Sequence, residues 1–122
     1  MLREESSIRL ARVEELDREL EDPGSQRAYR VGEDGVLLVR GRDGALRAFY
    51  NVCRHRGHEL LAPGETRTSN AIKCPYHAWV YSLDGRLAGA SRFGEQPSFE
   101  RDAHPLVSVE LHERDGWVVV EP

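Results

Sequence analysis

Short apolar runs separated by Asp-Gly dipeptides set the pattern along this chain of 122 residues. The runs 36–40 and 45–50 flank Asp43-Gly44, and the runs 79–83 and 86–88 flank Asp84-Gly85. An Asp-Gly dipeptide between two such runs is a strong sequence signal for a β-hairpin. The pattern therefore predicts two hairpins.

A third hairpin is expected near the end of the chain. Val107, Val109 and Leu111 alternate with polar residues, and Asp115-Gly116 separates this stretch from the apolar run 117–120. Strict alternation is typical of a half-buried strand, so residues 106–112 and 117–120 should pair. Because strands account for most of the pattern, the fold class is predicted to be all-β with antiparallel strands.

One short helix is predicted near the start, where Val13, Leu16 and Leu20 recur at helical spacing before Asp22-Pro23-Gly24 ends the run. Segment 90–103 is rich in Gly, Ser, Pro and charges, so we expect a surface loop held by Phe93 and Phe99. No repeat or linker divides the chain. We therefore interpret residues 1–122 as one domain.

Composition excludes several functional classes. Hydrophobic residues make up 39% and charged residues 31% of the chain, and the formal net charge is -4, as in soluble globular proteins. Nucleic acid is therefore an unexpected partner. No apolar run approaches the roughly 20 residues that span a bilayer, and the first residues lack the apolar core of a secretory signal. We expect a cytoplasmic protein without a membrane partner.

The candidate chemistry lies in two short segments, Cys53-Arg54-His55-Arg56-Gly57 and Cys74-Pro75-Tyr76-His77. Each combines a thiolate and an imidazole in one tight loop, and each follows a predicted strand, 49–52 or 71–73. A β scaffold can hold two such loops against the same metal. Cys53, His55, Cys74 and His77 are therefore predicted to be ligands of one metal centre.

Three interpretations of these ligands remain open. The two cysteines could form a disulfide, although an intracellular chain seldom keeps one. A structural zinc site usually pairs Cys with Cys and His with His within a segment, whereas here each segment is mixed. Mixed segments suit a [2Fe-2S] cluster with two thiolates on one iron and two imidazoles on the other. Two thiolates neutralise the oxidised core, and a neutral site accepts an electron more easily than a negative one.

At these residues the chain resembles the Rieske domain of Rieske non-haem iron oxygenases, the ring-hydroxylating dioxygenases and related monooxygenases. The resemblance runs from about residue 31 to 120. Its most specific parts are Asn51-Val52-Cys53-Arg54-His55-Arg56-Gly57 and Cys74-Pro75-Tyr76-His77-Ala78-Trp79. The high-potential Rieske proteins of respiratory complexes fit less well, since their loops carry two further cysteines. Ala78 stands where the family more often has Gly.

The resemblance implies the Rieske fold, with a small cluster-binding part at about residues 51–83 made from the two ligand loops. It further implies that Cys53 and Cys74 bind the inner iron, and His55 and His77 the outer one. One-electron transfer from a reductase or ferredoxin to an oxygenase iron centre would follow, by the chain either as the N-terminal domain of the oxygenase or as a free-standing Rieske ferredoxin-like protein. A structural zinc-binding module for protein contacts is the alternative function.

The resemblance also marks what is missing. Oxygenase large subunits add a mononuclear iron held by two histidines and a carboxylate, and His58, His104 and His112 form no such pattern with Asp or Glu in the sequence. We expect these histidines on the surface and no complete catalytic site in this chain.

Other residues near the ligands have two possible roles. Tyr76, Trp79 and Tyr81 could shield the cluster, although plain core packing is favoured for Trp79. A hydroxyl or backbone N–H near a sulfur would raise the potential by stabilising the reduced charge. Arg54, Arg56 and His58 could attract an acidic electron donor or simply be solvated. Gly57 and Pro75 are interpreted as turn residues.

Overall fold

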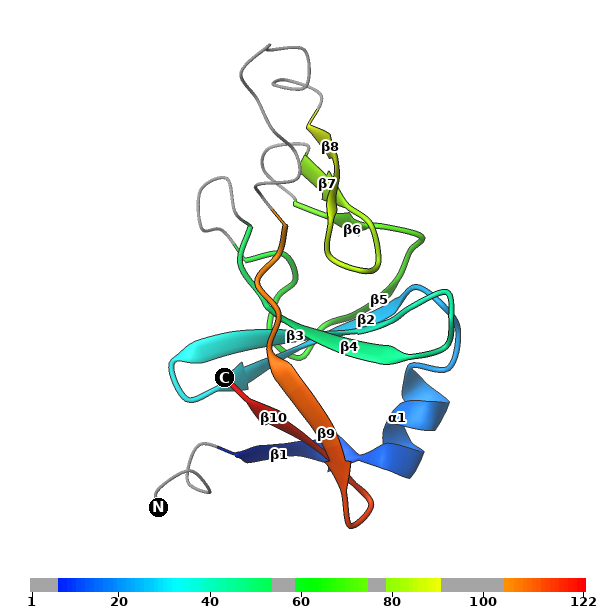
Figure 1. The fold of residues 1–122 in the computed structure, drawn as a ribbon, viewed down its shortest axis with the longest axis vertical. Helices are drawn as coiled ribbons and strands as arrows, with labels where there is room; N and C mark the ends of the chain where they lie inside the picture. Colours follow the sequence, from blue (N-terminus) through cyan, green and yellow to red (C-terminus); the bar gives the residue numbers. More distant parts are fainter. Residues whose placement is uncertain (1–6, 54–58, 75–78, 91–104) are drawn as a thin grey trace.

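The computed structural model describes residues 7–53, 59–74, 79–90 and 105–122. Within these ranges, three antiparallel β-sheets follow one another along the longest axis of the molecule (Figure 1). A single short helix, α1 (Val13–Glu19), accompanies them in the part of the chain described. The all-β fold class predicted from the sequence is confirmed.

The first sheet joins the two ends of the described chain. Its strand order is β1 (Ile8–Arg12), β10 (Trp117–Glu121) and β9 (Glu110–Arg114). The β9–β10 hairpin turns at Asp115 and Gly116, which both have positive φ. This confirms the hairpin that the Asp-Gly dipeptide predicted.

The middle sheet has the strand order β4 (Leu46–Tyr50), β3 (Asp34–Arg40), β2 (Ser25–Val31) and β5 (Thr66–Thr68). The third sheet is smaller and has the order β6 (Ile72–Lys73), β7 (Trp79–Tyr81) and β8 (Leu87–Ala90). The β3–β4 and β7–β8 pairs are the two remaining hairpins predicted from Asp-Gly dipeptides. Both are confirmed.

Two buried clusters cover the two faces of the middle sheet. The cluster shared with the third sheet, here called the cysteine core, consists of Ala28, Leu37, Val39, Phe49, Cys53, Leu60, Leu61, Ile72, Cys74, Trp79, Tyr81, Leu83, Leu87 and Leu106. The cluster shared with α1 and the first sheet, here called the helix core, consists of Ala11, Leu16, Leu20, Val31, Val36, Leu38, Ala48, Val109, Val118 and Val120. The middle sheet is therefore buried on both faces.

Strand β3 shows why its sequence does not alternate. Leu37 and Val39 point into the cysteine core, whereas Val36 and Leu38 point into the helix core. A strand buried on both faces is a continuous apolar run. The run Val36-Leu37-Leu38-Val39 thus follows from its central position in the molecule.

The predicted strand 106–112 was wrong in its first half. Strand β9 begins at Glu110, and the residues before it run along β4 instead: Tyr50 N–H donates to Val107 O at 2.9 Å and Val109 N–H donates to Ala48 O at 2.9 Å. Leu106 is buried in one core and Val109 in the other, so this segment bridges two layers. Alternation alone cannot show which neighbour a strand will have.

The helix is confirmed, with Leu16 and Leu20 buried, but strands β1, β2 and β5 were missed by the sequence analysis. Strand β2 is largely polar, and its Gln26 is only 1% exposed because the side chain donates a hydrogen bond to Ala71 O at 2.9 Å. A buried polar residue breaks the alternation by which a strand is recognised.

Most of the predicted loop 90–103 lies outside the described residues, together with Phe93 and Phe99. Within the described part of the chain, no helix is long and apolar enough to cross a membrane.

Candidate metal centre

The two cysteines lie in the same apolar cluster although 20 residues separate them in the chain. Cys53 follows the end of β4 and is fully buried, and Cys74 follows β6 and is 4% exposed. No disulfide joins the two cysteines in the structure. The fold thus brings both predicted thiolate ligands into the cysteine core.

The two predicted histidine ligands, His55 and His77, lie outside the described residues. They follow Cys53 by two positions and Cys74 by three along the chain. The four-ligand set therefore stays a prediction, supported by the location of its two cysteines. Arg54, Arg56, His58, Gly57, Pro75, Tyr76 and Ala78 also lie outside the described residues.

The second ligand segment is closed by the β6–β7 pair. Cys74 N–H donates to Trp79 O at 2.9 Å, so the chain leaves the sheet at Cys74 and returns beside it at Trp79. Trp79 itself is 3% exposed within the cysteine core. Core packing, the role favoured for Trp79 from the sequence, is confirmed.

The first ligand segment is closed by a side chain. The Asn51 side chain is fully buried, and its Oδ1 accepts hydrogen bonds from the N–H groups of Leu60 and Leu61 at 3.1 and 3.2 Å. Its Nδ2 donates to Leu61 O at 2.7 Å. The chain on either side of Cys53 and His55 is thereby fastened together.

Tyr81 contacts one of the predicted ligands directly. Its hydroxyl oxygen lies 3.6 Å from Cys53 Sγ, and the whole side chain is buried. The sequence analysis expected Tyr81 to shield the cluster and a hydroxyl near a sulfur to raise the potential. A thiolate bound to metal carries no proton, so in that state the hydroxyl would be the donor.

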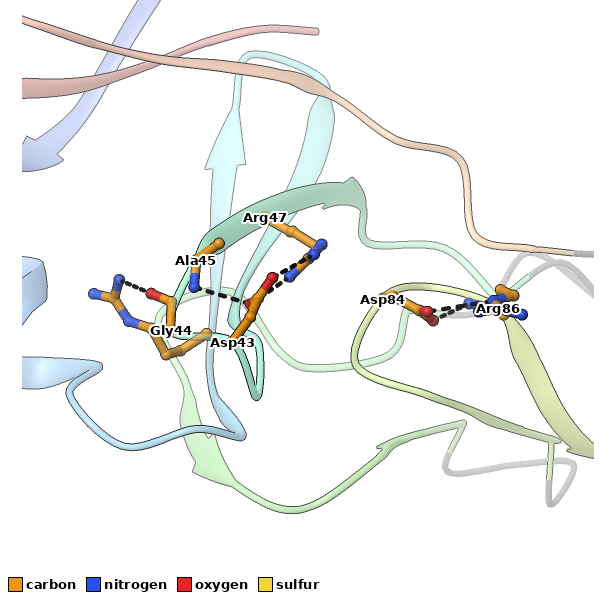
Figure 2. Close-up of polar contacts among 7 residues, drawn as sticks. Asp43, Gly44, Ala45, Arg47, Asp84 and Arg86 are labelled. Carbon is orange, nitrogen blue, oxygen red and sulfur yellow. Dashed lines mark hydrogen bonds and ion pairs between the residues drawn. The ribbon is translucent and has the colours of Figure 1, made fainter.

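Two hairpin turns each contain an aspartate paired with an arginine (Figure 2). Asp43 forms a bidentate ion pair with Arg47, at 3.1 and 3.0 Å, and accepts the Ala45 N–H, which together lower the Asp43 pKa to about 2. Hydrogen bonds from Ser82 and from Arg86 lower the pKa of Asp84. These carboxylates stabilise their own turns.

A hollow of about 290 Å³ separates these turns and is lined by Gly41, Arg42, Asp43, Arg47, Asn70, Ser82, Leu83 and Asp84. Since both carboxylates in it are already paired, we assign it no ligand.

One cluster of possible metal ligands escaped the sequence analysis. His112 Nε2 lies 3.4 Å from Glu110 Oε2 and 3.5 Å from Glu121 Oε2. The sequence analysis did not anticipate this cluster, which forms because β9 and β10 pair Glu110 with Glu121 beside His112. Cross-strand register is not visible in a sequence. One histidine with two carboxylates still differs from the two-histidine site of an oxygenase.

Comparison with known proteins identifies the family. Residues 8–100 match the model of the Rieske [2Fe-2S] domain, which is most of the chain. The chain belongs to the Rieske [2Fe-2S] domain family. This Rieske domain therefore has a [2Fe-2S] cluster as its implied cofactor, as the mixed Cys/His segments predicted.

The relatives of this Rieske domain are oxygenase subunits. It is 52% identical over 90 residues to the carnitine monooxygenase oxygenase subunit of Escherichia coli (strain K12). That match covers 74% of this chain and 24% of that protein. It is 37% identical over 103 residues to the glycine betaine monooxygenase oxygenase subunit of Chromohalobacter salexigens. That match covers 84% of this chain and 22% of that protein. The chain thus spans about a quarter of the length of these relatives.

Solved structures show the same fold. The quaternary ammonium Rieske monooxygenase CntA, in complex with L-carnitine, matches with a TM-score of 0.81 and 38% identity over 94% of this chain and 31% of that one. Naphthalene 1,2-dioxygenase matches with a TM-score of 0.80 and 26% identity, over 93% of this chain and 25% of that one. The predicted Rieske fold is confirmed.

The described residues fit the implied cofactor. Two buried cysteines, not joined in a disulfide, lie in one apolar core beside a buried hydroxyl, and thiolates of this kind are the soft ligands that iron–sulfur clusters need. The matched family favours the cluster over the zinc module and the disulfide.

Proposed function

We propose that this Rieske domain holds its [2Fe-2S] cluster on Cys53, His55, Cys74 and His77 and passes single electrons to the iron of an oxygenase. The observation that carries the proposal is the burial of Cys53 and Cys74 in one core, each followed within three residues by a histidine. A reductase or ferredoxin is the proposed donor, and an oxygenase catalytic domain or subunit the acceptor. We retain the prediction of one domain over 1–122, with its cluster-binding part at about 51–83.

When bound, the cluster supplies one-electron redox chemistry at a potential set by its ligands and surroundings. The chain contributes the rest. Cys53 and Cys74 provide thiolate ligands from a dry core, since they are at most 4% exposed. Tyr81 provides a hydroxyl near the Cys53 sulfur, and the β6–β7 pair fixes the spacing of Cys74 and Trp79.

Metal and sulfide analysis of the purified chain tests the proposal. We expect a red-brown protein with two irons and two acid-labile sulfides per chain and the electron paramagnetic resonance spectrum of a mixed Cys/His cluster when reduced. A colourless protein with one zinc would contradict it and favour the structural module.

Single substitutions test the ligand set. Cys53→Ser, His55→Ala, Cys74→Ser and His77→Ala should each abolish or strongly deplete the cluster. His112→Ala is the matched control, because His112 lies on β9 outside the cysteine core. Full iron content in any of the four ligand variants would remove that residue from the set.

We further propose that the oxygenase served by this domain acts on a small quaternary ammonium compound. The support is the 52% identity to a carnitine monooxygenase subunit and the structural match to CntA. The match covers about a quarter of the relative's length. The substrate would bind in a catalytic part outside that match.

Turnover measurements separate the electron carrier from the whole enzyme. With NADH, a reductase should reduce the cluster of the 122-residue chain. The chain alone should consume no carnitine or glycine betaine. A longer protein that joins this domain to an oxygenase catalytic part should oxidise one of them. Hydroxylation by the short chain would refute the assignment as a pure electron carrier. A cytoplasmic location remains a prediction.

A further inference from the structure

We infer that Asn51 is a positioning residue that fixes the first ligand segment, and through it the contact between Cys53 and Tyr81. The inference rests on the proposed function, because it concerns the geometry of a proposed ligand. Asn51 is one of few polar residues buried in the described chain, and its side chain is fully inaccessible. A carboxamide in that position is stabilised only when its polar atoms are paired.

The pairing is directed at one place in the chain. Both Oδ1 contacts and the Nδ2 contact go to backbone groups of Leu60 and Leu61, on the returning side of the segment that contains Cys53 and His55. Leu60 and Leu61 are themselves buried in the cysteine core. The Asn51 side chain thus substitutes for a strand pairing between the two ends of the segment.

The Asn51 backbone is held from the other side. Its N–H donates to Gly35 O at 2.9 Å, and a Cβ on Gly35 would lie only 3.2 Å from the Asn51 Cβ. Asn51 therefore packs against the end of the β2–β3 hairpin of the middle sheet. It ties the returning chain at 60–61 to that sheet, a few residues before Gly64 N–H donates to Ala28 O of β2 at 2.8 Å.

Cys53 is the next residue but one after Asn51, so a shift of Asn51 moves the Cys53 sulfur. The sulfur lies 3.6 Å from the Tyr81 hydroxyl, a distance that a small displacement would lengthen beyond contact. Hydrogen bonds to ligand sulfurs and the orientation of ligands tune the potential of a cluster. Asn51 should therefore act on the potential without touching the metal.

Two variants test the inference. Asn51→Leu keeps the shape but leaves three backbone groups of Leu60 and Leu61 without their partner, whereas Asn51→Asp keeps the two acceptor contacts. We expect amide exchange at Leu60 and Leu61 to rise about tenfold or more in Asn51→Leu. We also expect altered g values and a lower midpoint potential, with smaller changes in Asn51→Asp.

The controls are Val120→Ala and Leu16→Ala, two fully or almost fully buried positions of the helix core. They lower global stability without touching the ligand segment. If they reach the same loss of stability as Asn51→Leu and keep the wild-type potential and g values, positioning is supported. The inference is overturned if Asn51→Leu keeps the wild-type potential and g values, or if the controls change them equally.

The outcome for the wild-type chain separates this inference from the proposed function. A wild-type chain without a Rieske spectrum refutes the proposed function. A wild-type chain with the spectrum and an Asn51→Leu variant with unchanged spectroscopy refutes only the role of Asn51.

Discussion

A hydroxyl near the sulfur of a predicted ligand is the most specific feature at the scale of single residues. The Tyr81 oxygen is 3.6 Å from Cys53 Sγ, in a core where both side chains are fully buried. In a low-dielectric core a hydrogen bond is stronger than in water. Reduction adds negative charge to the cluster and its sulfurs, so a donor there stabilises the reduced state.

Tyr81→Phe should therefore lower the reduction potential and leave the cluster in place. If the hydrogen bond contributes about 0.5–1.5 kcal/mol more in the reduced state, the potential of a one-electron couple falls by about 20–60 mV. Protein-film voltammetry measures the shift. Tyr29→Phe, on β2 outside the cysteine core, is the control and should leave the potential unchanged.

The Asp43–Arg47 pair gives the chain an acid-sensitive turn. The pKa of Asp43 is lowered to about 2, mainly by the hydrogen bonds from Arg47 and from the Ala45 backbone. A lowered folded-state pKa stabilises the fold above the unfolded-state pKa of about 3.9, and the contribution is lost as pH falls toward the folded value. Since Asp43 is exposed, screening makes the effect small.

Asp43→Asn should accordingly lower the unfolding midpoint at pH 7, and the difference from wild type should shrink between about pH 4 and pH 2. Urea unfolding across that range measures it. Arg47→Gln should show the same pH dependence, because it removes the same pair. A difference that stays constant from pH 7 to pH 2 would contradict the role of this ion pair.

At the scale of elements, the β7–β8 turn is fitted against β4. Gly85 has φ +93°, its carbonyl oxygen accepts the Leu106 N–H at 2.8 Å, and a Cβ there would lie 2.5 Å from the Phe49 ring. The turn of the third sheet thus contacts both the middle sheet and the segment before β9. This contact fixes the hairpin that follows Cys74 relative to the strand that precedes Cys53.

Gly85→Ala should destabilise the chain by more than Gly44→Ala does. Gly44 has a similar φ of +85°, but a Cβ there meets nothing within 4 Å. The control therefore shows the backbone strain alone, about 1–2 kcal/mol, and the clash with Phe49 should add about 1–3 kcal/mol. Urea unfolding compares the two. Equal losses would mean that the Phe49 contact does not constrain the turn.

At the scale of the whole molecule, stability is divided between the two cores. The third sheet has strands of only two to four residues, which is at or below the short end of the usual strand length. It is held by the cysteine core and, in the proposed function, by the ligands Cys53 and Cys74 inside that core. The first sheet and α1 depend on the helix core instead.

Loss of the cluster should therefore loosen one half of the molecule more than the other. In Cys74→Ser, amide exchange should rise by about tenfold or more in β6, β7, β8 and residues 59–61, and much less in β1, β9 and β10. Hydrogen exchange with mass spectrometry measures both halves in one sample. A uniform rise over the whole chain would show that the two cores unfold together.

The sequence by itself determined what depends on neighbours along the chain. Asp-Gly dipeptides define the three hairpins because tight turns need such residues at fixed positions, and the helix follows from Val13, Leu16 and Leu20. Mixed Cys/His segments indicate the cluster because ligand type and spacing reflect its chemistry. These local signals were sufficient for the fold class and the cofactor.

Only the tertiary structure decided what depends on segments far apart in the chain. Residues 106–109 pair with β4 instead of extending β9. Buried Asn51 hydrogen-bonds to the backbone at 60–61, and buried Gln26 to the backbone of residue 71. His112 lies beside Glu121 of the neighbouring strand. Pairing between distant segments is set by the packing of the complete molecule. A polar residue in a sequence gives no sign of the backbone group that will pair with it once it is buried.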